Sequence, residues 1–407
     1  MSSLICVSGV GLVSPLGHTL PTFDEALFAG RSAVVAYTLE LEGLEPMAMP
    51  LAPCEFDDSE RSVSRLPLDR GTAMALAAAR DAYAQAGLAE TRPADERLGI
   101  YWGSGMAGIA TYDDTAKALY LEHRRVRPTA VLSAMPNAAA AELGLRFRAR
   151  GASLTYACAC ASSAVAIGEA MRAIRAGWID VAIVGGHESM LTPGTLAGWY
   201  AMRVLATPPA DDPASACRPF SADRNGFAMG EGAAALVIES EAHARARGAR
   251  IDLVLAGYAT NSDSTHMTNP DPSGQARAMR AALADAGLSP ADIGHINAHG
   301  TATTAGDAAE AASIHDVFGD DTPVTATKAI HGHLLGGGGA LELVATLRAL
   351  VHRRLPPTAN LRQLDPAFSI DVVRGEARDA PGLRWAVSNS FAFGGTNAVL
   401  VAGRIGS

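Results

Sequence analysis

The 407-residue sequence is poor in cysteine, aromatic residues and charge, and the scarcity of cysteine excludes particular kinds of site. Its five cysteines are an odd number without the spacing of a disulfide framework. Cys158 and Cys160 have no second pair of cysteines or histidines nearby that would complete a zinc site. We therefore expect a reducing, cytoplasmic compartment and no metal.

Basic residues are also in the minority, because 33 lysines and arginines face 42 aspartates and glutamates, for a formal net charge of −9. This balance argues against nucleic acid as a partner, although it allows local basic patches for an acidic protein. No apolar run reaches membrane-spanning length, and the first fifteen residues lack a basic start and a cleavage site. We expect neither a membrane span nor a signal peptide.

What the sequence does contain is an alternation of apolar strand-like runs with alanine-rich helices, which predicts an α/β fold with buried sheets. A long amphipathic helix is expected at 72–87, and a surface loop at 207–219. A hairpin-like strand at 232–239 closes the first series of elements, and a second series opens at Ile251. We expect two halves of similar plan, residues 1–250 and 251–407. The expected strands are 4–10, 98–102, 153–156, 181–184, 234–238, 251–259, 385–389 and 398–402.

The chain is organised around the stretch from Leu154 to Gly177, whose pattern predicts a strand, a sharp turn and a helix. Cys160 falls where this helix begins. Its thiol would therefore face unpaired backbone N–H groups and the positive end of the helix dipole, which favour a reactive thiolate. A cysteine in an apolar run is by itself more often an inert core residue, so the rest of the chain must decide.

Three loops of the second half carry the groups that a cysteine nucleophile needs. His299 stands in a turn of small and hydroxyl residues, and Lys328 and His333 precede a glycine run that opens another helix. The third loop, 389–397, has glycines that let backbone N–H groups approach a ligand. Two neutral imidazoles with no evident orienting carboxylate suit stabilisation of an enolate oxygen rather than hydrolysis. Such a set fits carbon–carbon bond formation between thioesters.

One further motif points elsewhere. The stretch Gly103–Gly108 follows a strand and matches the dinucleotide-binding fingerprint letter for letter. No clear second strand ending in an acidic residue follows it, and Arg124, Arg125 and Arg127 lie where that strand should end. We predict a tight turn beside a substrate pocket rather than a nucleotide loop.

Four segments, in the same order, resemble those of the elongating β-ketoacyl-[acyl carrier protein] synthases of the thiolase superfamily. They are the Cys160 segment, His299 with Gly300-Thr301, Lys328 with Gly332-His333, and 389–397. The resemblance covers nearly the whole chain. It implies a thiolase fold of two related halves in five layers, α-β-α-β-α. It also implies a homodimer, or a heterodimer with a related ketosynthase-like subunit.

The same resemblance implies a reaction and a role for each matching residue. An acyl group on Cys160 would condense with malonyl-ACP to give β-ketoacyl-ACP and CO2, in fatty acid elongation or in type II polyketide or polyene elongation. No cofactor is implied beyond the phosphopantetheine of the acyl carrier protein. His299 and His333 would act on malonyl-ACP, and Lys328 with its accompanying acid Glu342 would support them.

Further positions follow from the resemblance. Backbone N–H groups of Cys160 and Phe393 would form the oxyanion hole. The gate and substrate pocket would comprise Phe391, Phe393, Met106, Thr195, Trp199, Thr301 and Thr303. Carrier-protein docking would use Arg65, Arg70, Arg124, Arg125, Arg127 and Arg203.

Several positions depart from the family pattern. Cys158 stands where threonine or serine is common, and Ala392 replaces a glycine, which should stiffen the gate loop. Thr195 and Trp199 stand where glycine and phenylalanine are frequent, so their bulk should shorten or reshape the acyl pocket. Two alternative functions belong to other classes. One is a non-catalytic chain-length partner, which typically lacks the nucleophile, and the other is a CoA-dependent thiolase.

Overall fold

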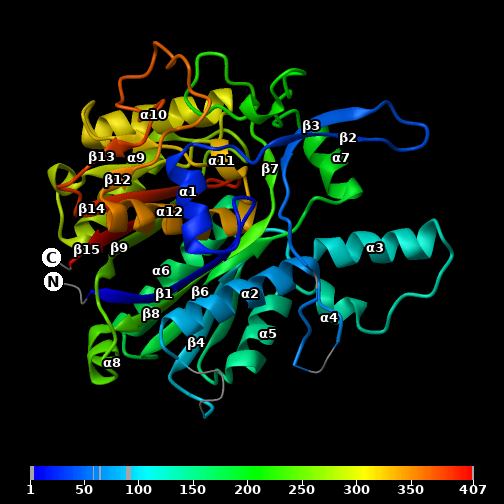
Figure 1. Cartoon of the computed structure of the whole chain (residues 1–407), viewed down its shortest axis with the longest axis horizontal. Coiled ribbons are helices and arrows are strands. Elements are labelled where there is room, and N and C mark those ends of the chain that lie inside the picture. The colour runs from blue at the N-terminus through cyan, green and yellow to red at the C-terminus, as the bar shows by residue number, and fades with distance from the viewer. Residues whose placement is uncertain (1–3, 58, 64–65, 89–92, 406–407) are drawn as a thin grey trace.

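The computed structural model describes residues 4–57, 59–63, 66–88 and 93–405, and it contains one ten-stranded sheet (Figure 1). The strand order is β11-β10-β14-β15-β9-β1-β8-β6-β4-β5. Strands of the first half are β1 (Ile5–Val13), β4 (Leu98–Gly103), β5 (Ser153–Tyr156), β6 (Val181–Glu188) and β8 (Gly232–Ser240). Those of the second half are β9 (Leu253–Ser262), β10 (His295–Asn297), β11 (Val324–Thr325), β14 (Trp385–Phe391) and β15 (Thr396–Arg404).

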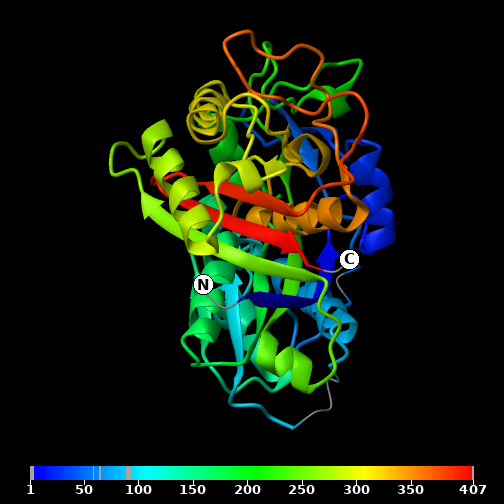
Figure 2. The ribbon, with the colours of Figure 1, turned by 90° about the vertical axis from the view of Figure 1, so that its left-hand side faces the viewer.

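The same five-strand arrangement occurs twice along this sheet. In the first half β4 is parallel to β5 and β6, and β8 is antiparallel to β6 and β1. In the second half β10 is parallel to β11 and β14, and β15 is antiparallel to β14 and β9. The two sets meet where β1 pairs antiparallel with β9, and Figure 2 shows the strands of the second set above those of the first.

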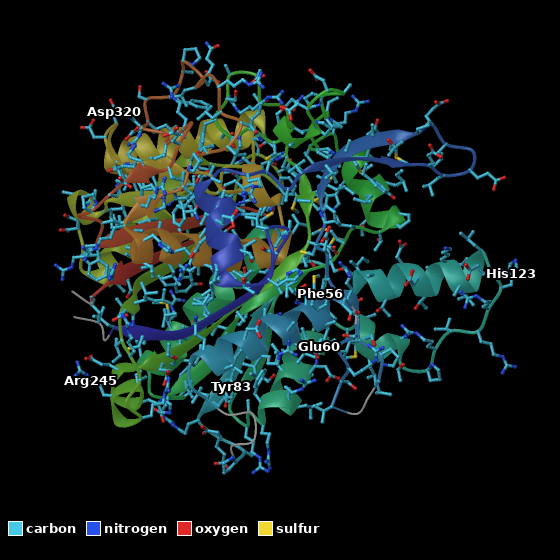
Figure 3. The ribbon with its side chains drawn as sticks, viewed as in Figure 1. Phe56, Glu60, Tyr83, His123, Arg245 and Asp320 are labelled. Atoms are coloured by element: carbon cyan, nitrogen blue, oxygen red, sulfur yellow. The ribbon has the colours of Figure 1, made fainter. Side chains whose placement is uncertain are left out.

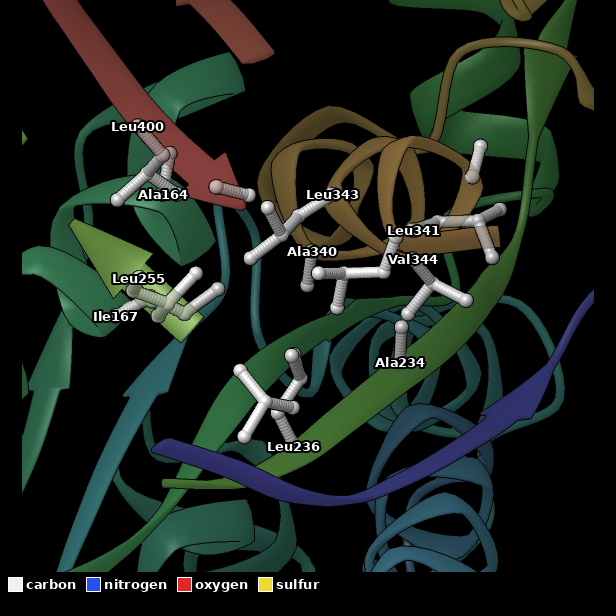
Figure 4. Packing of buried hydrophobic residues seen from close by; sticks show 14 of the residues in the cluster. Ala164, Ile167, Ala234, Leu236, Leu255, Ala340, Leu341, Leu343, Val344 and Leu400 are labelled. Atoms are coloured by element: carbon white, nitrogen blue, oxygen red, sulfur yellow. The ribbon is translucent and has the colours of Figure 1, made fainter. Parts of the chain in front are cut away.

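Helices complete a five-layered arrangement. In the central layer, α6 (Ser162–Arg175) and α12 (Gly338–His352) pack together between the two sets of strands. Figure 4 shows Ile167 of α6, Leu341 of α12 and Leu236 of β8 within this core. The outer faces are covered by α2 (Arg70–Gln85) and α5 (Ala138–Phe147) on the first set, and by α9 (Pro272–Ala286) and α10 (Thr304–Phe318) on the second. The α/β class and the predicted layers α-β-α-β-α are therefore confirmed.

Smaller elements surround these layers. Helices α1 (Leu20–Phe28), α3 (Ile109–Tyr120), α4 (Ala130–Ala134), α7 (Pro193–Ala201), α8 (Glu241–Ala246) and α11 (Lys328–His331) are added to the main ones. A three-stranded sheet joins β2 (Val35–Leu39), β3 (Met47–Ala52) and β7 (Met229–Gly230), and β12 (Arg354–Leu355) pairs with β13 (Arg378–Asp379). Among the described residues, no helix is both long and apolar enough to cross a membrane.

The predicted elements form close to their expected positions. The helix expected at 72–87 spans Arg70–Gln85 because the Asp69 carboxylate caps it, accepting the N–H of Gly71 at 2.9 Å. Strand β6 runs four residues beyond the apolar stretch at 181–184, to Glu188. These extra residues pair with β8 and are buried, although Gly185, Gly186 and His187 lack the apolar pattern of a strand.

Glycines bring the central elements close enough to build one site. A Cβ on Gly336 would lie 2.1 Å from the backbone nitrogen of Gly105, and a Cβ on Gly103 would lie 2.3 Å from that of Ser163. Only residues without a side chain permit this backbone contact. The glycine run before α12, the turn after β4 and the start of α6 therefore lie directly against one another.

Candidate active site

Cys160 lies at the start of the central helix α6, as the sequence predicts. It is the middle residue of a short 3₁₀ turn, Ala159–Ala161, which links β5 to the helix. Ala159 has a left-handed φ of 46°, and the Ser162 hydroxyl accepts the backbone N–H of Cys158 at 2.9 Å. These features turn the chain sharply, so that Cys160 is 6% exposed and lines a cavity, which Cys158 does not.

His333 contacts the cysteine directly. Its Nε2 lies 3.1 Å from the Sγ of Cys160, and its Nδ1 accepts the backbone N–H of Leu335 at 3.2 Å. Because the ring is neutral and Nδ1 is an acceptor, the ring proton must be on Nε2. His333 therefore donates its Nε2–H toward the sulfur.

His299 takes the same tautomer through Lys328. The ammonium of Lys328 lies 3.2 Å from the Nδ1 of His299 and donates to the His299 backbone carbonyl at 2.6 Å. The same ammonium forms a buried ion pair with Glu342 of α12. The proton of His299 is therefore on Nε2, and the two imidazole rings lie edge to face with centroids 5.4 Å apart.

Burial keeps both imidazoles neutral. It lowers the pKa of His299 and of His333 well below the ordinary value, and the nearby Lys328 charge lowers both further. Burial raises the pKa of Glu342 to about 7, whereas the Lys328 ammonium acts in the opposite direction. The cavity thus presents two neutral N–H donors close to a fixed positive charge.

The sulfur of Cys160 experiences two opposing effects. Burial raises the pKa of the thiol to about 12, and the Lys328 charge and the backbone N–H groups of Phe393 and Cys160 lower it. Burial is the larger effect on the pKa, so it favours a thiol at rest rather than the thiolate expected from the helix start alone. The N–H donors around the sulfur stabilise the thiolate when it forms.

Two buried carboxylates hold the loop of His299 in place. Glu310 of α10 accepts the backbone N–H groups of His299 at 2.8 Å and Gly300 at 2.7 Å, and Asp307 accepts that of Ala302 at 3.0 Å. Neither residue was predicted from the sequence. The available signal was the presence of acidic residues in an otherwise alanine-rich helical segment.

Glu188, at the end of β6, plays the same part for the glycine turn after β4. Its carboxylate accepts the backbone N–H groups of Gly105 at 2.7 Å, Met106 at 3.0 Å and Gly336 at 3.1 Å. Gly105 and Met106 belong to the stretch that matches the dinucleotide fingerprint. Their N–H groups are thus already occupied, and the stretch forms a tight turn beside the site.

A cavity of about 250 Å³ opens onto the cysteine and both histidines. The predicted residues Trp199, Phe391, Phe393, Thr301 and Thr303 line it. Met106 and Thr195 do not, contrary to prediction. Met106 packs into the hydrophobic cluster beside the cavity, and the Thr195 hydroxyl donates to the backbone carbonyl of Met190.

The loop after β9 also lines this cavity, which the sequence did not suggest. Asp263 and the segment 266–270 contribute to the lining, and the carbonyl of Met267 accepts the N–H of Gly394 at 2.7 Å. Positive φ angles fall on Gly394 (85°) and Gly395 (77°), whereas Ala392 adopts none. The turn therefore does not require a left-handed backbone at Ala392, and the stiffening of the gate loop expected from its Cβ stays a prediction.

The predicted docking arginines fall into different environments. Arg124, Arg125 and Arg127 are exposed on the loop beyond α3, the loop whose His123 is labelled in Figure 3. Arg203 is exposed between Met202 and Val204, which line the cavity. Arg65 lies outside the described residues.

Arg70 requires a correction. Its Nη2 lies 2.8 Å from a carboxylate oxygen of Glu231 and donates to the backbone carbonyl of Cys54 at 2.9 Å, and its side chain is 25% exposed. A guanidinium held in this way connects segments within the chain, and it does not face a partner.

The ligand atoms of Cys160, His299 and His333 all lie within 4.8 Å of one another, a spacing that could also hold a metal ion. In the tautomers described above, both Nε2 atoms carry protons. A metal would have to displace these protons and the hydrogen bonds at Nδ1 that fix them.

The repeated α/β halves and the site at the start of the central helix define a thiolase fold with a cysteine and two histidines. The chain belongs to the β-ketoacyl synthase family. The N-terminal domain model of that family matches residues 2–244, and its C-terminal domain model matches residues 253–362.

Individual relatives agree with this assignment. A 3-oxoacyl-[acyl-carrier-protein] synthase 2 from Staphylococcus aureus (strain COL) is 37% identical over 407 residues, covering 98% of this chain and 97% of the relative. A β-ketoacyl synthase from Burkholderia phymatum STM815 superposes with a TM-score of 0.91 at 34% identity, covering 99% of this chain and all of the other. A chain of the AntDE:AntF complex, described as a type II PKS acyl-carrier protein in complex with its ketosynthase, superposes with a TM-score of 0.91 at 26% identity, covering both chains fully. The resemblance and the thiolase fold predicted from the sequence are confirmed.

Proposed function

We propose that the protein is a β-ketoacyl-ACP synthase that condenses an acyl group on Cys160 with malonyl-ACP, releasing CO2. One observation carries the proposal. The Sγ of Cys160 lies 3.1 Å from the Nε2 of His333, and Lys328 sets His299 in the same tautomer beside it. A nucleophile next to two neutral N–H donors is the set that both half-reactions require.

In the first half-reaction the Cys160 sulfur attacks the thioester of an acyl carrier protein. The tetrahedral oxyanion would be held by the backbone N–H groups of Cys160 and Phe393, which face the sulfur. Collapse breaks the bond to the phosphopantetheine sulfur, which leaves as a thiol after taking up the proton that the cysteine loses. The acyl group remains on Cys160.

In the second half-reaction the first carrier protein has left, and malonyl-ACP enters the cavity beside the acylated Cys160. Both Nε2–H groups would donate to its thioester oxygen, so the electron pair released with CO2 is stabilised as an enolate. The enolate carbon then attacks the acyl-Cys160 carbonyl, and the cysteine leaves as a thiolate as β-ketoacyl-ACP forms. The thiolate takes up a proton from solvent and restores the resting thiol. Lys328 and Glu342 would keep His299 oriented throughout, with no cofactor beyond the phosphopantetheine arm.

We also propose partners, organisation and location. The carrier protein would dock by Arg203 at the mouth of the cavity, with Arg124, Arg125 and Arg127 as further docking positions. Strand β5 is at the sheet edge and its Leu154 is 45% exposed, which suits pairing with a second copy or a related subunit. The repeated strand order supports a division into halves 1–250 and 251–407. Five free cysteines support a cytoplasmic location.

The two alternative functions fit the site less well. A non-catalytic chain-length partner has no use for a cysteine held against a histidine, and this chain has both. A CoA-dependent thiolase would act without a carrier protein, so activity on CoA thioesters alone would identify it.

The test incubates the protein with acyl-ACP and malonyl-ACP. Intact-mass spectrometry then measures acylation of the protein and formation of the condensation product. Cys160→Ala should abolish acylation and condensation, Cys160→Gln should leave a malonyl decarboxylase, and the matched control Cys158→Ala should retain both steps. His299→Ala and His333→Ala should each lose malonyl decarboxylation while acyl transfer survives at least in part. Acylation found on Cys158, or equal loss of both half-reactions in both histidine variants, would contradict the proposal.

A further inference from the structure

Trp199 belongs to an aromatic wall of the cavity. Its indole stacks on the Phe393 ring, with centroids 6.3 Å apart and planes at 20°, and meets Phe227 edge on, with centroids 6.0 Å apart at 71°. Phe227 in turn meets the ring of His333 edge on, with centroids 5.2 Å apart. All four residues line the cavity that contains Cys160. The wall therefore runs from the gate to a catalytic imidazole.

Phe393 connects this wall to the nucleophile. Its backbone N–H faces the Cys160 sulfur and acts to lower the pKa of the thiol, whereas its ring stacks against the indole of Trp199. The two glycines that follow it, Gly394 and Gly395, both have positive φ, and glycine gives a loop the backbone freedom that movement of the Phe393 ring would need. An acyl chain that displaces the Phe393 ring therefore uncovers the flat face of the indole.

The energetic consequence depends on the shape of the acyl chain. Offset stacking of flat π-systems stabilises a contact beyond the area it buries. A saturated chain has tetrahedral carbons and covers the indole without stacking. A conjugated chain is planar and can take the place of the Phe393 ring. The stacking contact that is lost when Phe393 moves is then replaced by a contact between the indole and the substrate.

We propose that Trp199 is a specificity-determining residue that selects acyl chains with conjugated double bonds next to the thioester. The inference rests on the function proposed above. It adds the substrate class, namely 2,4-dienoyl or longer polyenoyl groups on the carrier protein. The conjugated segment stacks on the indole when the Phe393 ring moves away from it.

The experiment compares two six-carbon acyl groups of equal length, hexanoyl-ACP and (2E,4E)-hexa-2,4-dienoyl-ACP. The rate of acylation of Cys160 is followed by intact mass, and the dienoyl-to-hexanoyl ratio of kcat/KM is taken for each protein. Comparing this ratio between variants cancels the intrinsic difference in thioester reactivity. In Trp199→Leu the ratio should fall about fivefold to tenfold below that of the wild type, the range expected for one aromatic contact.

Matched variants separate stacking from packing. Trp199→Phe keeps a smaller ring, so its ratio should lie between those of the wild type and Trp199→Leu even if the leucine variant folds poorly. Tyr200→Leu removes the neighbouring aromatic residue of α7, which is 41% exposed, and should leave the ratio unchanged.

Equal ratios in the wild type, Trp199→Phe and Trp199→Leu would overturn the inference. So would a fall of the same size in Tyr200→Leu. If the wild type becomes acylated by neither thioester, the proposed function itself fails and takes this inference with it. Acylation by both with an unchanged ratio refutes only the role of Trp199.

Discussion

Removing one partner of the buried Lys328–Glu342 pair should be far more damaging than removing both. Each side chain is only 1% exposed, so neither charge can be hydrated after its partner is lost. Breaking such a pair by a single substitution costs about 3–5 kcal/mol, whereas exchanging both residues for apolar ones is often nearly neutral. We expect Glu342→Leu to lose about 3–5 kcal/mol of unfolding free energy and Lys328→Met/Glu342→Leu to lose clearly less.

The single variant Lys328→Met should depend on pH. Burial already raises the pKa of Glu342 to about 7 with the lysine present, and the lysine charge acts to lower it. Without Lys328 the pKa of Glu342 rises further, so the carboxyl is neutral at and below neutral pH. The loss of stability should therefore be small near pH 6 and grow toward pH 8, as deprotonation leaves an unpaired buried carboxylate.

Urea unfolding at pH 6 and pH 8 measures both effects, and a double-mutant cycle gives the coupling. As a control, Glu241→Leu/Arg245→Met removes an exposed pair, whose Arg245 is marked in Figure 3, and should cost under about 1 kcal/mol. The double variant at the site should fold yet lose malonyl decarboxylation, because nothing then holds His299 in its Nε2–H tautomer. Additive losses, or wild-type decarboxylation in the double variant, would refute the reasoning.

Three other predictions test the nucleophile, acid stability and docking. Iodoacetamide should modify Cys160 before Cys158, because only Cys160 of the two lines the cavity, where N–H donors face its sulfur; peptide mapping that finds Cys158 modified first would contradict this. Burial lowers the pKa of His295 to about 3, so the unfolded chain binds a proton below pH 6.5 that the folded chain does not, and stability falls with acid. From this residue the wild type should lose about 2 kcal/mol between pH 8 and pH 5, and equal acid slopes in His295→Gln and the wild type would disprove it. Arg203→Glu should raise the KM for acyl-ACP but not for a small pantetheine thioester, and an unchanged KM for acyl-ACP argues against docking there.

Local patterns were sufficient for the main features of the site. The helix start at Cys160, the turn of His299 and the glycine run after His333 are all encoded within short segments, because strand ends, caps and glycine turns depend on neighbouring residues. The same holds for the strands, whose apolar cores were predicted although their ends were placed too early in β6, β9 and β14.

The sequence by itself determined the α/β class, the two similar series of elements and the residue types that gather at the site. Only the tertiary structure decided how those residues behave. Burial of Cys160 raises its pKa against the effect of the helix start, and the acceptors at Nδ1 set the proton of each histidine on Nε2. Arg70 was predicted to face a partner but pairs with Glu231, which lies 161 residues away. Charge state, tautomer and exposure depend on groups brought together from distant segments, so no local pattern can contain them.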